Sequence, residues 1–404
     1  MEFDDKEVFM KYPIVTERVD LFDVSIVITM IVDIDPMPSL EDAKVAFYKA
    51  CSCHEVLNFR VVIEQSGEAF YVDNDDPSNN ISKTDLTVYE LINDNERKRF
   101  RIEKGEFIRA FLSPDGLVVM MHHLGGDGKS LLYFIETFMK CLDKKRCELA
   151  PFRNLTSDDL PSSGKIPFFY DLLTGAWNRK WKREKHVFDF ELMDRAYDEF
   201  WKDNKTKTII KKYEGAELKD LLNSAKRAGV SFTSYFITDM IKEDPGKLDI
   251  GLAVDGRIDG NRCMGNQATG ISLDYRYDRK RSFEDNCRAV QKRMRKKLGD
   301  DRYRYFVLGF MSKLDSTLKD ALNLEHAGVF TSPVSARVAD ILGYGDKVKD
   351  ISITNLTRAD IDLDYGDYRI KKIVFIPPVV SYAKNVFAIV TAGDVLTVTR
   401  HVFE

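Results

Sequence analysis

Residues 117–128 read LVVMMHHLGGDG, and residues 129–141 continue as KSLLYFIETFMKC. The apolar run Leu117 to Met121 predicts a buried strand that ends at two adjacent histidines. Gly125 and Gly126 allow the backbone to leave that strand in a tight turn. Apolar residues then recur at helical spacing as far as Cys141. The stretch therefore predicts strand, turn and helix in direct succession, with an imidazole held at the turn.

The two histidines of this stretch are expected to play different parts. Successive side chains of a strand face opposite sides, so His122 and His123 cannot both point into one cavity. A histidine titrates near neutral pH and can accept a proton and return it later. One of the two is therefore a candidate general base, and the other is expected to pack.

The run His122-His123-x-x-x-Asp127-Gly128 resembles the H-H-x-x-x-D-G motif of the chloramphenicol acetyltransferase-like superfamily. The similarity is greatest to condensation domains of peptide synthetases and to free-standing alcohol acetyltransferase-like enzymes. A second match lies in the other half of the chain, where Val254-Asp255-Gly256-Arg257 and Gly265-Asn266 resemble the arginine-bearing strand and the G-N element of the family.

Weaker similarities extend the resemblance over nearly the whole chain. They are His54-Glu55-Val56-Leu57, Phe107-Ile108-Arg109 and Thr354-Asn355-Leu356. Three positions depart from the family pattern. Cys53 and Asn58 stand where condensation domains usually have arginines, and Glu106 stands where proline is frequent.

The resemblance implies a mixed α/β fold of two lobes, each a mixed β-sheet covered by helices. The lobes form a V-shaped pseudo-dimer with a tunnel between them. It implies that His123 is the catalytic base near the middle of the tunnel and that four residues shape the site without doing chemistry. These four are His122, Asp127, Gly128 and Arg257, with Asp127 paired to Arg257 across the lobes. Candidate tunnel or substrate-binding residues are Gly126, Asn266, Thr354 and Asn355.

The implied reaction is acyl transfer from a thioester to an alcohol or amine acceptor. The co-substrate would be acyl-coenzyme A or an acyl-phosphopantetheine carrier protein, and no permanently bound cofactor or metal is expected. The alternative from another class is a catalytically inactive condensation-like binding or scaffold protein. Because two lobes in one chain can build the site alone, a monomer is expected.

Length and turn signals predict the domain organisation. The 404 residues are expected to form an N-terminal lobe at 1–150, a linker or crossover at 151–200, and a C-terminal lobe at 201–404. Ser39 with Asp42 predicts a helix from Leu40. Further expected elements are the hairpin 57–63 and 69–72, a polar loop at 74–80, the helices 87–92, 216–228 and 231–242, and the strands 24–32, 107–112, 206–213, 248–254, 270–275, 348–355, 370–376, 386–391 and 395–402.

Composition excludes several classes of protein. A net charge of -4 gives no field that would attract nucleic acid. The start Met1-Glu2-Phe3-Asp4-Asp5-Lys6 lacks the pattern of an export signal. The longest apolar stretch, Val24 to Val32, is too short for a membrane span. The six scattered cysteines are expected to be reduced, and the protein to be cytoplasmic.

A phosphate-binding loop and a metal site are both rejected, and the role of the basic runs is left open. Gly128-Lys129-Ser130 follows a strand, but the first glycine of a phosphate-binding loop would fall on His123. His122, His123 and Asp127 diverge too much for a metal site. The basic runs at 97–101, 179–185, 279–281 and 292–297 are either solvated faces or surfaces for coenzyme A phosphates or an acidic carrier protein.

Overall fold

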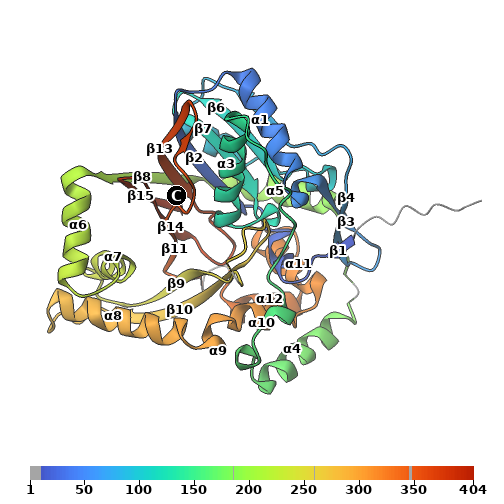
Figure 1. Cartoon of the computed structure of the whole chain (residues 1–404). Helices are drawn as coiled ribbons and strands as arrows, with labels where there is room; N and C mark the ends of the chain where they lie inside the picture. The colour runs from blue at the N-terminus through green and yellow to red at the C-terminus, as the bar shows by residue number, and fades with distance from the viewer. Residues whose placement is uncertain (1–10, 185, 259, 345–347) are drawn as a thin grey trace, which may run out of the picture.

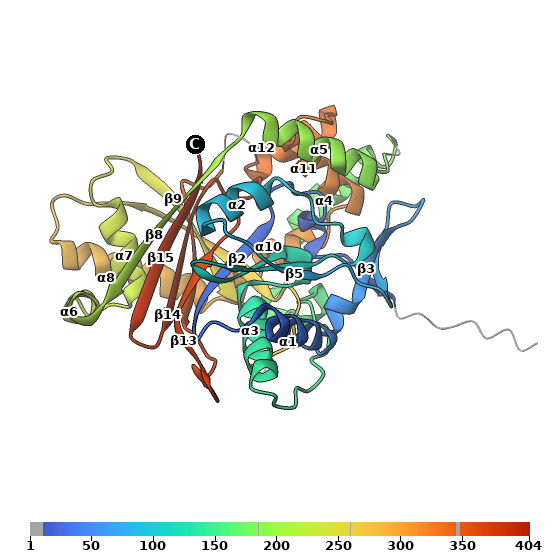
Figure 2. The ribbon, with the colours of Figure 1, turned by 90° about the horizontal axis from the view of Figure 1, so that it is seen from above.

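The computed structural model describes residues 11–184, 186–258, 260–344 and 348–404, so the acidic start at 1–6 lies outside the described residues. Figures 1 and 2 show a mixed α and β molecule with two sheet-rich halves. Within the described ranges the strands form two six-stranded sheets and one three-stranded sheet. The expected two-lobed mixed fold is confirmed.

The first large sheet has the order β12-β13-β2-β7-β6-β5. Its central strand β7 is buried along its whole length and pairs antiparallel with β2 and β6. Helices α1 and α3 pack together beside this sheet (Figure 2). The bounds are β2 Val27–Asp35, β5 Asn80–Lys83, β6 Ile108–Ser113, β7 Gly116–His122, β12 Asp364–Tyr365, β13 Tyr368–Ile376, α1 Leu40–Ser52, α2 Val88–Glu96 and α3 Gly128–Leu142.

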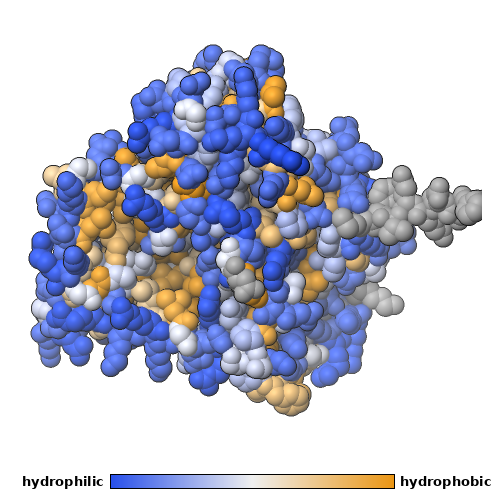
Figure 3. Space-filling model, in the orientation of Figure 1, coloured by the Kyte–Doolittle hydropathy of each residue, from blue (hydrophilic) through white to orange (hydrophobic). Residues whose placement is uncertain are grey.

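The second large sheet has the order β10-β9-β11-β14-β15-β8. Strand β11 runs parallel to both of its neighbours, and the other pairs are antiparallel. Helices α6, α7 and α8 lie along it, and Figure 3 shows a hollow lined by apolar side chains between these helices and the sheet. The bounds are β8 Thr206–Glu214, β9 Lys247–Asp255, β10 Ala268–Arg276, β11 Ile351–Arg358, β14 Asn385–Ala392, β15 Val395–Phe403, α6 Gly215–Arg227, α7 Phe232–Ile241 and α8 Phe283–Leu298.

The division between the sheets does not follow residue order. Strands β12 and β13 come late in the chain, yet β13 pairs with β2 of the first sheet. Residues 373–376 of β13 are buried, because this strand packs against both the first sheet and the strands β14 and β15. Residues 201–404 therefore contribute strands to both sheets, and the lobe boundaries at 150 and 200 remain a proposal.

The remaining elements frame the two sheets. A small sheet joins β1 Lys11–Pro13, β4 Ala69–Asp73 and β3 Phe59–Ile63. The crossover at 151–200 contains two helices, α4 Phe168–Trp181 and α5 Phe190–Asp203. The further helices are α9 Asp301–Arg304, α10 Phe306–Met311, α11 Ser316–His326 and α12 Pro333–Leu342, and a short 3-10 helix η1 spans Glu17–Asp20.

Local signals predicted helix starts well and some strand ends less well. Ser39 caps α1 by accepting a hydrogen bond from the Asp42 amide, and Ser231 caps α7 in the same way. Strand β11 runs to Arg358 rather than ending at Asn355, with a bulge after Asn355 that the pattern does not reveal. Asn80, expected at the end of a loop, begins strand β5.

No helix in the described part of the chain has both the length and the apolar character needed to cross a membrane.

Candidate active site

The double-histidine turn begins where strand β7 ends. The His122 amide donates to the Phe107 carbonyl at 2.9 Å, and the His123 amide donates to the Ile26 carbonyl at 3.2 Å. The chain then forms a 3-10 turn, His123–Gly125. Gly126 follows with φ 142°, where a side chain would be strained, and a Cβ there would lie 2.5 Å from the Cβ of Ser130. Backbone bonds on both sides therefore fix the position of the turn.

His122 is completely buried behind the turn. Its Nδ1 accepts a hydrogen bond from the Leu124 amide at 3.2 Å. Burial, followed by the charges of His123, Arg99 and Arg109, lowers the pKa of His122 to about 3. The ring is therefore neutral at physiological pH and helps to hold the turn.

His123 lies on the other side of the turn and keeps 17% of its side chain exposed. Its Nδ1 lies 3.7 Å from Oδ2 of Asp20, a residue of η1 that is buried. This Nδ1 makes no hydrogen bond within the described part of the molecule. Burial raises the pKa of Asp20 to about 6, while His123 and the amide of Asn266 oppose that rise. The exposed histidine thus faces a buried carboxylate.

Asp127 turns away from His123 and joins the two halves of the chain. It caps α3 by accepting from the Ser130 amide at 2.9 Å. Its two carboxylate oxygens also accept from Nη2 and Nη1 of Arg257 at 2.8 and 2.9 Å, and Oδ2 accepts from the Gln267 amide at 3.0 Å. The predicted ion pair of Asp127 with Arg257 is present, and the side chains are 6% and 3% exposed.

Arg257 stays charged in this buried place. Burial opposes its charge, but Asp127 and Asp255 outweigh that effect and raise the pKa of Arg257. Nη1 reaches Asp255 at 3.1 Å, and Nη2 reaches the hydroxyl of Ser130 at 3.0 Å. Both carboxylate oxygens of Asp127 are thus engaged by donors of the protein.

The loop between β9 and β10 reaches the turn directly. The Ser130 hydroxyl donates to the Gly265 carbonyl at 2.9 Å, and a Cβ on Gly126 would lie 3.2 Å from the Gly265 nitrogen. The side chain of Asn266 donates to Oδ2 of Asp20 at 3.0 Å. Asn266 therefore lies at the site, bonded to the carboxylate that faces His123.

Gly128 is also close to the other half of the chain. A Cβ there would lie 2.8 Å from Phe375 and 3.2 Å from Leu356. A larger residue would therefore push the start of α3 away from β13 and β11.

Thr354 and Asn355 lie on β11, and no described contact joins them to His123. Asn355 donates from Nδ2 to the Thr233 hydroxyl of α7 at 2.8 Å and accepts from the Thr357 amide at 2.7 Å. Thr354 is half-buried. Their expected place at the tunnel wall remains a prediction.

Two of the three positions that depart from the family pattern, Glu106 and Asn58, have structural roles here. Glu106 forms a buried ion pair with Arg109 at 2.6 Å, and Arg109 also donates to the carbonyls of Lys98 and Arg99. Asn58 donates to the carbonyls of Cys51 and His54. Cys53, like the other five cysteines, is a free thiol.

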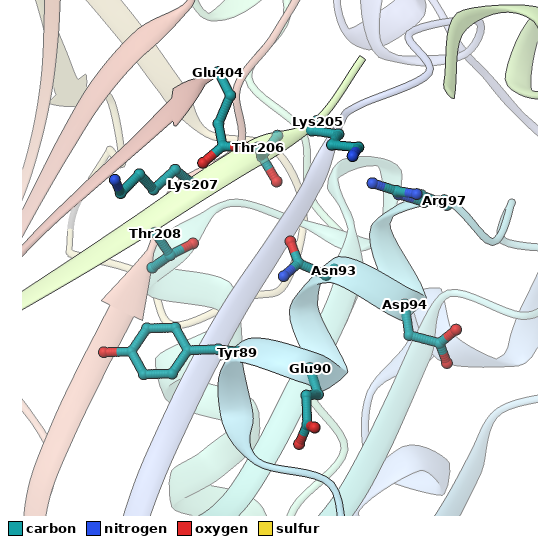
Figure 4. A pocket seen from close by; sticks show the side chains of 10 residues that line it. All are labelled: Tyr89, Glu90, Asn93, Asp94, Arg97, Lys205, Thr206, Lys207, Thr208 and Glu404. Carbon is teal, nitrogen blue, oxygen red and sulfur yellow. The ribbon is translucent and has the colours of Figure 1, made fainter. Parts of the chain in front are cut away.

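The other candidate features lie elsewhere. Among the described residues no group of three histidines, cysteines or carboxylates could hold a metal ion. An open groove of about 610 Å³ lies between α2 and the start of β8 (Figure 4) and includes none of the candidate catalytic or tunnel residues. Within the basic run at 97–101, Arg99 and Arg101 are bound by Asp194 and Glu103.

Two residues were missed by sequence reasoning. Asp20 is separated from His123 by about a hundred residues. The sequence shows it only as an acidic residue that precedes the apolar stretch Val24 to Val32. His401 has no partner signal in the sequence, but its Nε2 lies 3.1 Å from the buried carboxylate of Glu96. Only the pairing of distant segments brings these groups together.

Comparison with known proteins reveals the fold but no close relative. No family model matches the chain, and no curated protein matches it in sequence. TRI3 trichothecene 15-O-acetyltransferase from Fusarium sporotrichioides superposes with a TM-score of 0.64 at 10% identity, covering 100% of this chain and 92% of that one. The first condensation domain of the CDA synthetase gives a TM-score of 0.63 at 12% identity, covering 98% and 91%.

A third structure was solved with ligands. The starter condensation domain of rhizomide synthetase RzmA, a variant in complex with C8-CoA and Leu-SNAC, gives a TM-score of 0.59 at 10% identity, covering 97% and 88%. Together these similarities show that the chain has the fold of these condensation domains and of the TRI3 acetyltransferase. At such low identity the similarity establishes the fold and leaves the chemistry to the site.

Proposed function

We propose that this protein is an acyltransferase that moves an acyl group from a thioester to an alcohol or amine, with His123 as the general base. The observation that carries the proposal is the asymmetric histidine pair: His122 is buried and neutral, whereas His123 is partly exposed beside Asp20. The Asp127–Arg257 pair supports it, because it holds this turn against the second half of the chain.

The reaction needs no covalent enzyme intermediate. His123 takes the proton from the acceptor, and the acceptor oxygen or nitrogen bonds to the thioester carbonyl carbon. The tetrahedral oxyanion collapses as the carbon–sulfur bond breaks, and the leaving thiolate takes the proton back from the imidazolium. The products are an ester or amide and a free thiol.

The donor is acyl-coenzyme A or an acylated phosphopantetheine carrier protein. The neighbour that was solved with C8-CoA supports the first choice, and the condensation domains support the second. In this proposal the two halves enclose a tunnel around His123, and the protein is a cytoplasmic monomer without a permanent cofactor.

The test is thiol release from a panel of acyl-coenzyme A thioesters and acylated carrier proteins, each with alcohol and amine acceptors. Wild type should release thiol in step with product, and His123→Ala should be slower by roughly a hundred- to ten-thousand-fold. Equal rates in the two proteins would contradict the proposal. Absence of transfer with every donor would favour the inactive binding or scaffold alternative.

A further inference from the structure

The carboxylate of Asp20 is held beside His123 by an extensive buried scaffold. Asp20 belongs to η1, and the side chains of Lys319, Asp320 and Asn323 of α11 contact residues 15–19 at this short helix. Lys319 donates to the Val15 carbonyl at 2.6 Å, and Asn323 donates to the Val19 carbonyl at 2.5 Å. Arg18 forms a fully buried bidentate pair with Asp320 at 2.7 and 2.5 Å.

These contacts carry a cost in folding free energy, because buried charges lose hydration and their pairing only partly compensates for that loss. Arg18 and Asp320 are both completely buried, and Lys319 is nearly so. The contacts with α11 fix the position of η1, and therefore also that of the Asp20 carboxylate at its end. From the opposite side Asn266 donates to Asp20 Oδ2 at 3.0 Å. Two halves of the chain thus hold one carboxylate.

The groups that interact with Asp20 include Asn266, which is neutral, and His123, which can carry a positive charge. They also include Glu17, Asp23, Tyr71 and Tyr344, which cannot. Burial raises the pKa of Tyr71 and Tyr344, so both are neutral near pH 7. His123 is therefore the group on which the negative charge of Asp20 can act.

We propose that Asp20 is the positioning residue of His123, orienting the imidazole through Nδ1 and balancing the imidazolium that forms during transfer. The inference rests on the proposed function. Oδ2 lies 3.7 Å from Nδ1, beyond hydrogen-bond distance, and Nδ1 has no other partner in the described structure. A small closure on substrate binding would complete this bond, as is common for catalytic contacts.

In the reaction, the carboxylate keeps its charge and the acceptor proton moves to Nε2 of His123. Because Nδ1 is turned toward Asp20, Nε2 is the nitrogen left for the acceptor. The proton then leaves on the thiol, so Asp20 and His123 both return to their starting states. Asn266 completes the arrangement by holding Asp20.

The variant Asp20→Asn separates this role from a structural one. Folding raises the pKa of Asp20 from 3.8 to about 6, so its stabilising contribution is complete below pH 3.8 and is lost as the pH rises through 6. Above pH 6 the charged carboxylate thus costs stability. Asp20→Asn should raise Tm by a few degrees at pH 7.5 while kcat falls by roughly a hundredfold with KM little changed.

The matched control is Asp23→Asn, three residues along the chain. Asp23 is equally buried, but its carboxylate accepts four hydrogen bonds from Ser25 and Ser381. Its loss should lower Tm and leave kcat little changed. Asp20→Asn should show the reverse pattern, and Asn266→Ala should lower kcat by less than Asp20→Asn does.

A measurement without substrate keeps the inference testable on its own. The NMR signals of the His123 ring, identified by their loss in His123→Ala, should lie at different chemical shifts in Asp20→Asn and in wild type at one fixed pH, because the carboxylate that orients Nδ1 is gone. Unchanged ring signals together with unchanged kcat would overturn the role of Asp20. If instead the signals move but wild type transfers no acyl group, the proposed function fails and the Asp20–His123 contact stands.

Discussion

Asp127 and Asp20 are two buried carboxylates on opposite sides of one double-histidine turn, and their surroundings differ. Asp127 accepts hydrogen bonds from Arg257 and from the amides of Ser130 and Gln267. Asp20 receives a single side-chain hydrogen bond, from Asn266, and faces His123 at 3.7 Å. A carboxylate whose oxygens already accept several hydrogen bonds, such as Asp127, stabilises the structure. A carboxylate that accepts few, such as Asp20, can still interact with a charge that forms beside it.

The largest loss of stability is expected when the ion pair of Asp127 with Arg257 is broken. Asp127→Ala or Arg257→Ala leaves an uncompensated buried charge, at a cost of about 3–5 kcal/mol. Each variant should therefore lower both Tm and activity. The check is a double-mutant cycle measured by denaturant unfolding.

In that cycle the double variant should be less damaged than the sum of the two single variants. Simple additivity would show that the contact of Asp127 with Arg257 carries no energy. Asp127 would then not stabilise the protein through Arg257, and the proposed difference between Asp127 and Asp20 would be wrong.

An intermediate effect is expected at Glu96, which joins α2 to the second sheet. Its carboxylate accepts from Thr206 at 2.6 Å and pairs with His401. Burial lowers the pKa of His401, but Glu96 and the Pro377 carbonyl together raise it by more. The folded pKa of His401 is therefore raised, so the stabilisation is complete below about pH 6.5 and is lost as the pH rises through the folded pKa.

His401→Gln should accordingly cost about 1.5–3 kcal/mol at pH 6, and the deficit should shrink toward pH 9. Thermal unfolding of wild type and variant across this range is the measurement. His186→Gln is the matched control, since His186 is partly exposed and pairs with Glu184 on the surface. A deficit independent of pH would rule out an ion pair at His401.

The smallest effect should come from the exposed contact between the halves. Arg262 reaches Glu136 of α3 at 2.6 Å, with side chains 43% and 13% exposed. Water screens this pair, so Glu136→Gln should cost only about 0.2–1 kcal/mol. The cost should fall further in high salt.

Chemical denaturation at low and high salt measures the effect of Glu136→Gln. If Glu136→Gln lowered the free energy of unfolding as much as Asp127→Ala does, burial would not determine how much each of these ion pairs stabilises the protein.

The sequence alone predicted much of this protein, because local patterns determined those parts. Continuous apolar runs predicted β7 and β14, and capping residues predicted the starts of α1 and α7. The motif around His122 and His123, with the distant Arg257 and Asn266, led to the two-lobed mixed fold that the structure has. The Asp127–Arg257 pair followed from that resemblance, and the structure contains it.

Tertiary structure alone decided the rest, since no local pattern records which distant segments meet. Strand β13 could have joined either sheet, and its burial between both placed it beside β2. The same is true of Asp20: the buried Arg18–Asp320 pair, 302 residues apart in sequence, fixes η1 and brings a carboxylate to His123. The sequence thus determined the candidate base, and long-range packing of buried charges determined its partner.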